Sequence, residues 1–147
     1  MTNQSIKEIQ DEIIEEFSIL DGDQEMSNFY IMELGQKLPD YPEEKRTDDH
    51  IVKGCQSKVW LNSSFDQNTV VYQADSNTAI TKGLVSLLVR ILSNQSPDAI
   101  VNSDLFFMKE IGMDRFIGTQ RSNGFASMIK QMKMDAVALK AKVELNN

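Results

Sequence analysis

The chain has 147 residues, of which 41% are hydrophobic and 25% charged, and its formal net charge at pH 7 is −7. This length and composition are typical of a single globular domain that folds around its own core. The acidic excess argues against nucleic-acid binding, because nucleic-acid-binding proteins use cations to neutralise phosphates. It also argues against binding to an anionic membrane surface.

One cysteine and one histidine restrict metal and disulfide chemistry. A structural zinc site needs about four Cys or His ligands, and Cys55 with His50 provides too few. An intrachain disulfide needs a second thiol, and a free thiol is typical of a reducing compartment. The N-terminal residues are polar and acidic rather than signal-like, and the longest apolar stretch is too short for a membrane span. We therefore expect a cytoplasmic protein.

The first 37 residues predict two helices. Residues 6–17 carry apolar side chains at helical spacing, with acidic residues between them that we expect to form a solvated outer face. Asp21-Gly22-Asp23 interrupts this pattern, and a second helix is expected over residues 25–37, before Pro39 and Pro42. Its expected inward side chains are Met26, Phe29, Tyr30 and Leu34.

The middle of the chain predicts a small sheet. Residues 39–49 are charged and aperiodic, which indicates a solvated loop. Residues 59–65 and 69–74 are rich in β-branched and aromatic side chains, and Asp66-Gln67-Asn68 between them fits a turn. These segments predict an antiparallel hairpin, with residues 50–53 as a third short strand.

The helical pattern returns at residue 77. Residues 77–92 predict a central helix that is apolar on most sides, with Lys82, Ser86 and Arg90 as one polar stripe. Short helices are expected near residue 98 and over residues 106–111, followed by a long last helix. The order of elements predicts an α+β fold, in which a small antiparallel sheet of about three strands packs against several helices on one side.

Cys55 is the most informative residue for function. It follows Gly54, which permits a sharp turn and a close approach of another chain. Lys53 and Lys58 flank it, and nearby cations favour the thiolate. A lone cysteine is more often a small buried hydrophobic residue, so the residues alone leave both interpretations open. The absence of a second thiol suits a cysteine that receives a group from another protein.

Several segments resemble the SufE-like (SufE/CsdE) sulfur-acceptor proteins of iron–sulfur cluster assembly. They occur in the family's order and spacing over about residues 17–141, which is the expected core of a single domain at residues 1–147. The segment at residues 114–117 lacks a histidine that the family often has there. The matching segments are Tyr30-Ile31-Met32-Glu33-Leu34-Gly35-Gln36-Lys37-Leu38-Pro39, Val52-Lys53-Gly54-Cys55-Gln56-Ser57-Lys58-Val59-Trp60-Leu61, Ala74-Asp75-Ser76, Thr81-Lys82-Gly83-Leu84 and Arg121-Ser122-Asn123-Gly124-Phe125.

The resemblance implies a SufE/IscU-like fold and a persulfide carrier that is not itself an enzyme. A PLP-dependent cysteine desulfurase (SufS/CsdA-like) would pass sulfur to Cys55, and the chain would stimulate that desulfurase and deliver sulfur towards a downstream iron–sulfur scaffold. The transfer resembles thiol–disulfide exchange and needs no cofactor or metal in this chain. The resemblance also implies supporting roles in the cysteine loop or the partner surface for Gly54, Gln56, Ser57, Asp75 and Arg121.

Other interpretations remain open at this point. Asp75 also fits an N-cap of the following helix, and Arg121 fits a surface ion pair beside Ser122 as N-cap. An IscU-type iron–sulfur scaffold is an alternative function, although Cys55 and His50 are few ligands for a cluster. A protein-interaction module with an inert cysteine is a further alternative. For a sulfur carrier, we expect the thiol to be covered by its loop at rest and exposed by its partner.

Overall fold

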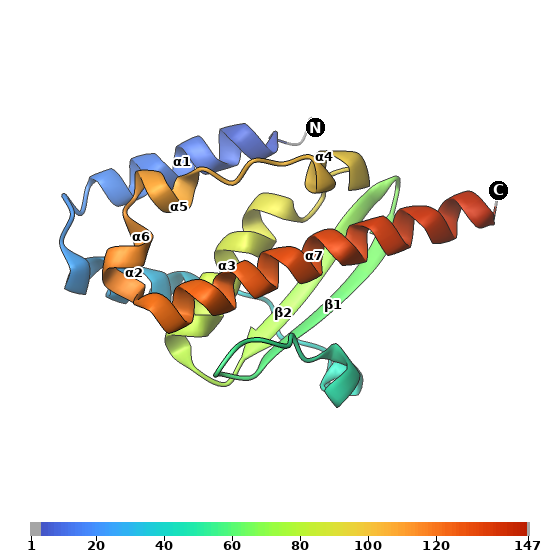
Figure 1. The fold of residues 1–147 in the computed structure, drawn as a ribbon, viewed down its shortest axis with the longest axis horizontal. Coiled ribbons are helices and arrows are strands. Elements are labelled where there is room, and N and C mark those ends of the chain that lie inside the picture. Colours follow the sequence, from blue (N-terminus) through green and yellow to red (C-terminus); the bar gives the residue numbers. More distant parts are fainter. Residues whose placement is uncertain (1–3, 147) are drawn as a thin grey trace.

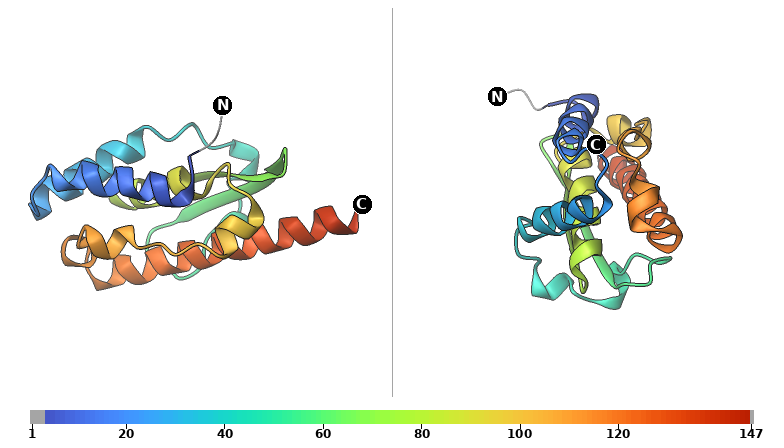
Figure 2. Two further views of the ribbon diagram at one scale, coloured as in Figure 1. Left: turned by 90° about the horizontal axis from the view of Figure 1, so that it is seen from above. Right: turned by 90° about the vertical axis from the view of Figure 1, so that its left-hand side faces the viewer.

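The computed structural model describes residues 4–146 and has the α+β fold that the sequence predicts (Figure 1). A two-stranded antiparallel sheet packs against a layer of helices, and the C-terminal end of the last helix projects beyond the hairpin turn (Figures 1 and 2). The elements are α1 (Ile6–Ser18), α2 (Gln24–Gln36), the 3-10 turns Glu43–Lys45 and Asp48–His50, β1 (Val59–Asp66), β2 (Thr69–Ser76), α3 (Ala79–Leu92), α4 (Pro97–Val101), α5 (Phe107–Glu110), α6 (Met113–Ile117) and α7 (Thr119–Leu145).

The hairpin forms as predicted around a two-residue turn. Gln67 and Asn68 both have positive φ, which matches the right-handed twist of the two strands. Side chains alternate along the strands, so one face packs against α3 and α7 and the other carries Trp60 and Asp75. The buried side chains of the first face are Val59, Leu61, Val70, Tyr72 and Ala74.

The predicted third strand does not form a ladder. Residues 48–50 adopt a 3-10 turn and Gly54 has a φ of +97°, so the intervening segment stays extended for too few residues. It makes one antiparallel bridge, between Ile51 and Trp60, and the Val52 N–H donates to the Val59 carbonyl at 2.8 Å. The sheet therefore has two strands.

The predicted central helix is confirmed as α3, which is buried between α2 and the sheet. The predicted inward face of α2 is partly wrong, because Met26 and Phe29 are 52% and 53% exposed. The buried side of α2 carries Ser27, Ile31 and Gly35 instead. A Cβ on Gly83 of α3 would lie 2.0 Å from the Ile31 carbonyl oxygen, so the two helices cross at backbone contact and small residues face the crossing.

Two other predictions about the helices need correction. The acidic face of α1 is not wholly solvated, because Glu12 and Glu16 pair with Arg90 of α3 at 3.4 and 2.5 Å. The last helix begins at Thr119 with Gly118 at the N-cap, so Ser122 lies inside the first turn. The short helix α6 was not predicted. No helix within residues 4–146 has the length and apolar character to span a membrane.

Candidate functional site

The loop at residues 53–58, termed the Cys55 loop, connects the bridge at Ile51 to β1 and contacts α7. Gly54 has a positive φ, and a Cβ at this position would lie 2.5 Å from the Ser127 Oγ of α7. The expected sharp turn is therefore present, and the close contact is with α7 of the same chain. A residue with a side chain would disturb both the backbone and this contact.

The Cys55 thiol is half-buried against α7. Its Sγ donates a weak hydrogen bond to the Gly124 carbonyl at 3.4 Å, and a Cβ on Gly124 would lie 3.3 Å from that sulfur. Burial raises the pKa of the Cys55 thiol. The expectation that Lys53 and Lys58 favour the thiolate is not met at rest, because both are exposed and desolvation alone determines the shift. The resting thiol is therefore protonated near neutral pH.

Four of the predicted site residues line one pocket of about 120 Å³: Cys55, Gln56, Ser57 and Arg121. The walls come from the Cys55 loop, the start of α3 and the first turns of α7, segments that are distant in the sequence. The other lining residues were not predicted as site residues, although Thr81, Leu84 and Gly124 lie in the segments that resemble SufE-like proteins. They are Thr78, Ile80, Thr81, Leu84, Gln120, Gly124 and Met128.

The second half of the Cys55 loop is hydrogen-bonded to the turn between β2 and α3. The Ser57 hydroxyl lies 2.9 Å from the Thr78 hydroxyl and accepts a hydrogen bond from Thr81 at 3.3 Å. The Lys58 N–H donates to the Asn77 side chain at 3.0 Å, and the Asn77 N–H donates to the Lys58 carbonyl at 3.2 Å. Ser57 thus attaches the loop to the turn before α3 and to its first turn.

Arg121 lies at the pocket on an exposed part of α7. Its Nη1 donates to the Ile117 carbonyl at 3.3 Å, which closes the preceding turn. The surface ion pair considered from the sequence is not formed within residues 4–146, where this carbonyl is the guanidinium's hydrogen-bond partner. Arg121 is therefore a positively charged residue in the lining of the thiol pocket.

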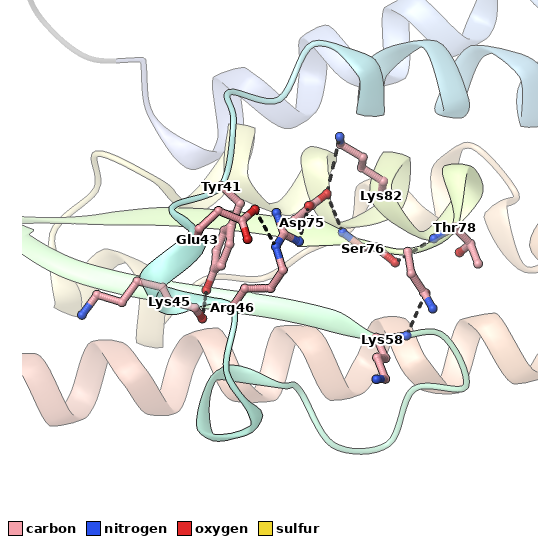
Figure 3. Close-up of polar contacts among 10 residues, drawn as sticks. Tyr41, Glu43, Lys45, Arg46, Lys58, Asp75, Ser76, Thr78 and Lys82 are labelled. Carbon is pink, nitrogen blue, oxygen red and sulfur yellow. Dashed lines mark hydrogen bonds and ion pairs between the residues drawn. The ribbon is translucent and has the colours of Figure 1, made fainter.

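Asp75 does not line the pocket. It lies on the other face of the hairpin, where its carboxylate accepts hydrogen bonds from Arg46 at 2.7 Å and from the Ser76 N–H at 2.8 Å, and pairs with Lys82 at 3.4 Å (Figure 3). Burial opposes ionisation, but these bonds outweigh it and lower the pKa of Asp75. The capping role considered from the sequence is wrong, because Thr78 occupies the N-cap of α3 and no side chain caps it.

Arg46 was assigned to a solvated loop, but the structure places it in an aromatic site. Its guanidinium lies 4.9 Å from the Trp60 ring centroid and 5.4 Å from that of Tyr41, and its side chain is only 27% exposed. Tyr41 is itself buried. The sequence of this segment did not reveal the site, because Trp60 and Asp75, which complete it, come from other parts of the chain.

Comparison with known proteins identifies the family. The sequence model of the SufE family, described as an Fe-S metabolism associated domain, matches residues 11–136. The chain belongs to the SufE family. Uncharacterised SufE-like proteins of Rhizobium etli and Rhizobium meliloti are 37% and 34% identical to it over 131 residues, which is 86% of this chain and 88% and 93% of theirs.

The SufE-like fold also appears among solved structures. A hypothetical protein from Thermus thermophilus superposes with a TM-score of 0.74 at 18% identity, covering 90% of this chain and 96% of its own. This similarity shows the shared fold. Family membership connects the chain to iron–sulfur metabolism.

Proposed function

We propose that the chain is a sulfur acceptor that forms a persulfide on Cys55, stimulates a PLP-dependent cysteine desulfurase, and delivers the sulfur for iron–sulfur cluster assembly. The supporting observation is the position of its only cysteine, which lines a pocket beside Arg121 in a chain of the SufE family. In this role the chain is a carrier and activator in the cytoplasm, and the desulfurase carries out the cleavage of free cysteine.

The transfer is an exchange between sulfur atoms. The Cys55 thiol gives its proton to solvent or to a partner base, and the thiolate attacks the outer sulfur of the persulfide on the desulfurase cysteine. A bond forms from Cys55 Sγ to that sulfur, and the original sulfur–sulfur bond breaks. Its electron pair leaves on the desulfurase cysteine, which takes up a proton. No external oxidant or reductant is needed.

The pocket suits a persulfide that is covered between encounters. A cavity volume of roughly 10–15 Å³ holds one water molecule. The pocket of about 120 Å³ therefore leaves room for one more sulfur atom next to Cys55. The half-buried thiol with a raised pKa is a poor nucleophile at rest. We therefore propose that the desulfurase binds a conformation with the Cys55 loop open, in which the thiol is solvated and ionises more readily.

The direct test is sulfur acceptance by Cys55→Ser. The wild-type chain, mixed with a cysteine desulfurase and free cysteine, should gain the mass of one sulfur atom, and a thiol reductant should remove it. The serine variant should fold normally and gain nothing. Omitting free cysteine gives the matched control for both proteins. A one-sulfur gain on the serine variant, measured by intact mass spectrometry, would refute the assignment of Cys55.

A further inference from the structure

A cluster on the face of the hairpin that carries Trp60 and Asp75 connects four segments of the chain. The Arg46 cluster consists of Arg46, the rings of Tyr41 and Trp60, and the charged groups of Asp75 and Lys82. Figure 3 shows Arg46 reaching the Asp75 carboxylate, which also faces Lys82 at the start of α3. A guanidinium between two rings and a carboxylate has a fixed position, because it is planar and bonds in defined directions.

The cluster continues into the attachment of the Cys55 loop. Asp75 is paired across the hairpin with Trp60, and Ser76, which follows it, starts the turn into α3. The next residues of this turn, Asn77 and Thr78, hold Lys58 and Ser57 of the Cys55 loop. A continuous set of hydrogen bonds and ion pairs therefore runs from Arg46 to the loop that contains the thiol, although Arg46 is not among the residues that line the pocket.

We propose that Arg46 is a positioning residue for Cys55: through Asp75 it holds the turn between β2 and α3, and this turn holds the Cys55 loop closed over the pocket. The inference deepens the proposed function and rests on it for the role of the thiol. Loss of the Arg46–Asp75 contact frees the turn, and the open conformation of the loop then becomes more populated.

The charges around Asp75 explain why this one contact matters. Its carboxylate is 17% exposed, and Arg46 at 2.7 Å is closer than Lys82 at 3.4 Å. The Glu43 carboxylate, at 3.1 Å from Arg46, is 81% exposed and is a weaker partner. Removing Arg46 would leave a mostly buried carboxylate with one longer ion pair, so the turn would move to solvate it.

The experiment measures alkylation of Cys55 by iodoacetamide in the free, folded protein, together with hydrogen exchange at residues 55–58 and 76–79. Arg46→Gln and Asp75→Asn should each raise the alkylation rate by about three- to tenfold and increase exchange in both segments. The double variant should react no faster than either single variant, because both changes break the same contact. The alkylation rate of Arg46→Lys should fall between those of wild type and Arg46→Gln, since lysine keeps the charge but lacks the planar guanidinium that can form two hydrogen bonds at once.

The matched control is Arg90→Gln, which removes a guanidinium that pairs with Glu12 and Glu16 at the other end of α3. It should alter stability but leave alkylation within about twofold of wild type. Equal rates for Arg46→Gln and wild type, or for Arg46→Gln and Arg90→Gln, would overturn the proposal, as would additive effects in the double variant. If Arg46→Gln does not fold, Asp75→Asn alone decides, because it replaces one oxygen atom. No desulfurase is present, so this result is independent of whether Cys55 accepts sulfur.

Discussion

The contact between Gly124 and Cys55 allows a test in which stability and thiol position change separately. Gly124 lies in the second turn of α7, and its replacement by alanine should stabilise the helix by about 1 kcal/mol. The new Cβ would lie 3.3 Å from Cys55 Sγ, 3.6 Å from its Cα and 3.7 Å from its Cβ, so only the sulfur contact is tighter than usual. That sulfur is on a loop next to Gly54 and can move by a few tenths of an ångström.

We therefore expect Gly124→Ala to have a free energy of unfolding between that of wild type and about 1 kcal/mol above it. The thiol should nevertheless be displaced from the Gly124 carbonyl towards solvent and react faster with iodoacetamide. Urea unfolding, followed by fluorescence of the single tryptophan, Trp60, measures the first effect. Intact mass spectrometry over a time course of alkylation measures the second.

The control for the gain in helix propensity is Asn123→Ala, a change at the neighbouring exposed position. It should stabilise α7 by a similar amount and leave the alkylation rate unchanged. Two results would refute the reasoning about Gly124. A loss of more than about 1 kcal/mol in Gly124→Ala would mean that the Cys55 loop cannot adjust. An alkylation rate equal to that of Asn123→Ala would mean that this contact does not hold the thiol.

Three further predictions concern Gly83, the pKa of Cys55 and Arg121. Gly83→Ala should lower the free energy of unfolding by about 1–3 kcal/mol or more, because its Cβ would meet a backbone carbonyl of α2 at 2.0 Å; a urea midpoint equal to wild type would contradict this. Because burial raises the pKa of Cys55, its alkylation rate should rise with pH around a midpoint above that of an unfolded control peptide, and a midpoint at or below that of the peptide would argue against a covered thiol. Arg121→Ala should weaken desulfurase stimulation while the unfolding free energy changes by less than about 0.5 kcal/mol; unchanged stimulation across a partner titration would leave Arg121 with a structural role only.

The sequence alone determined the features that depend on neighbouring residues. Apolar spacing predicted α1, α3 and the long α7, since a helix repeats every 3.6 residues and shows this in any window of a few turns. The β-branched runs on both sides of residues 66–68 predicted the hairpin and its turn for the same reason. The unique cysteine after Gly54 indicated the residue to examine, because a single thiol and a flexible neighbour are visible without knowledge of the fold.

The tertiary structure decided everything that depends on contacts between distant segments. The buried face of α2 follows from the backbone contact between Gly35 and Gly83, which no periodicity of α2 records. The pKa of Cys55 follows from its burial against α7 and not from its lysine neighbours in sequence. Arg46 looked like one charge among many until folding brought Trp60 and Asp75 to it, because burial and pairing are properties of the packed chain rather than of the segment.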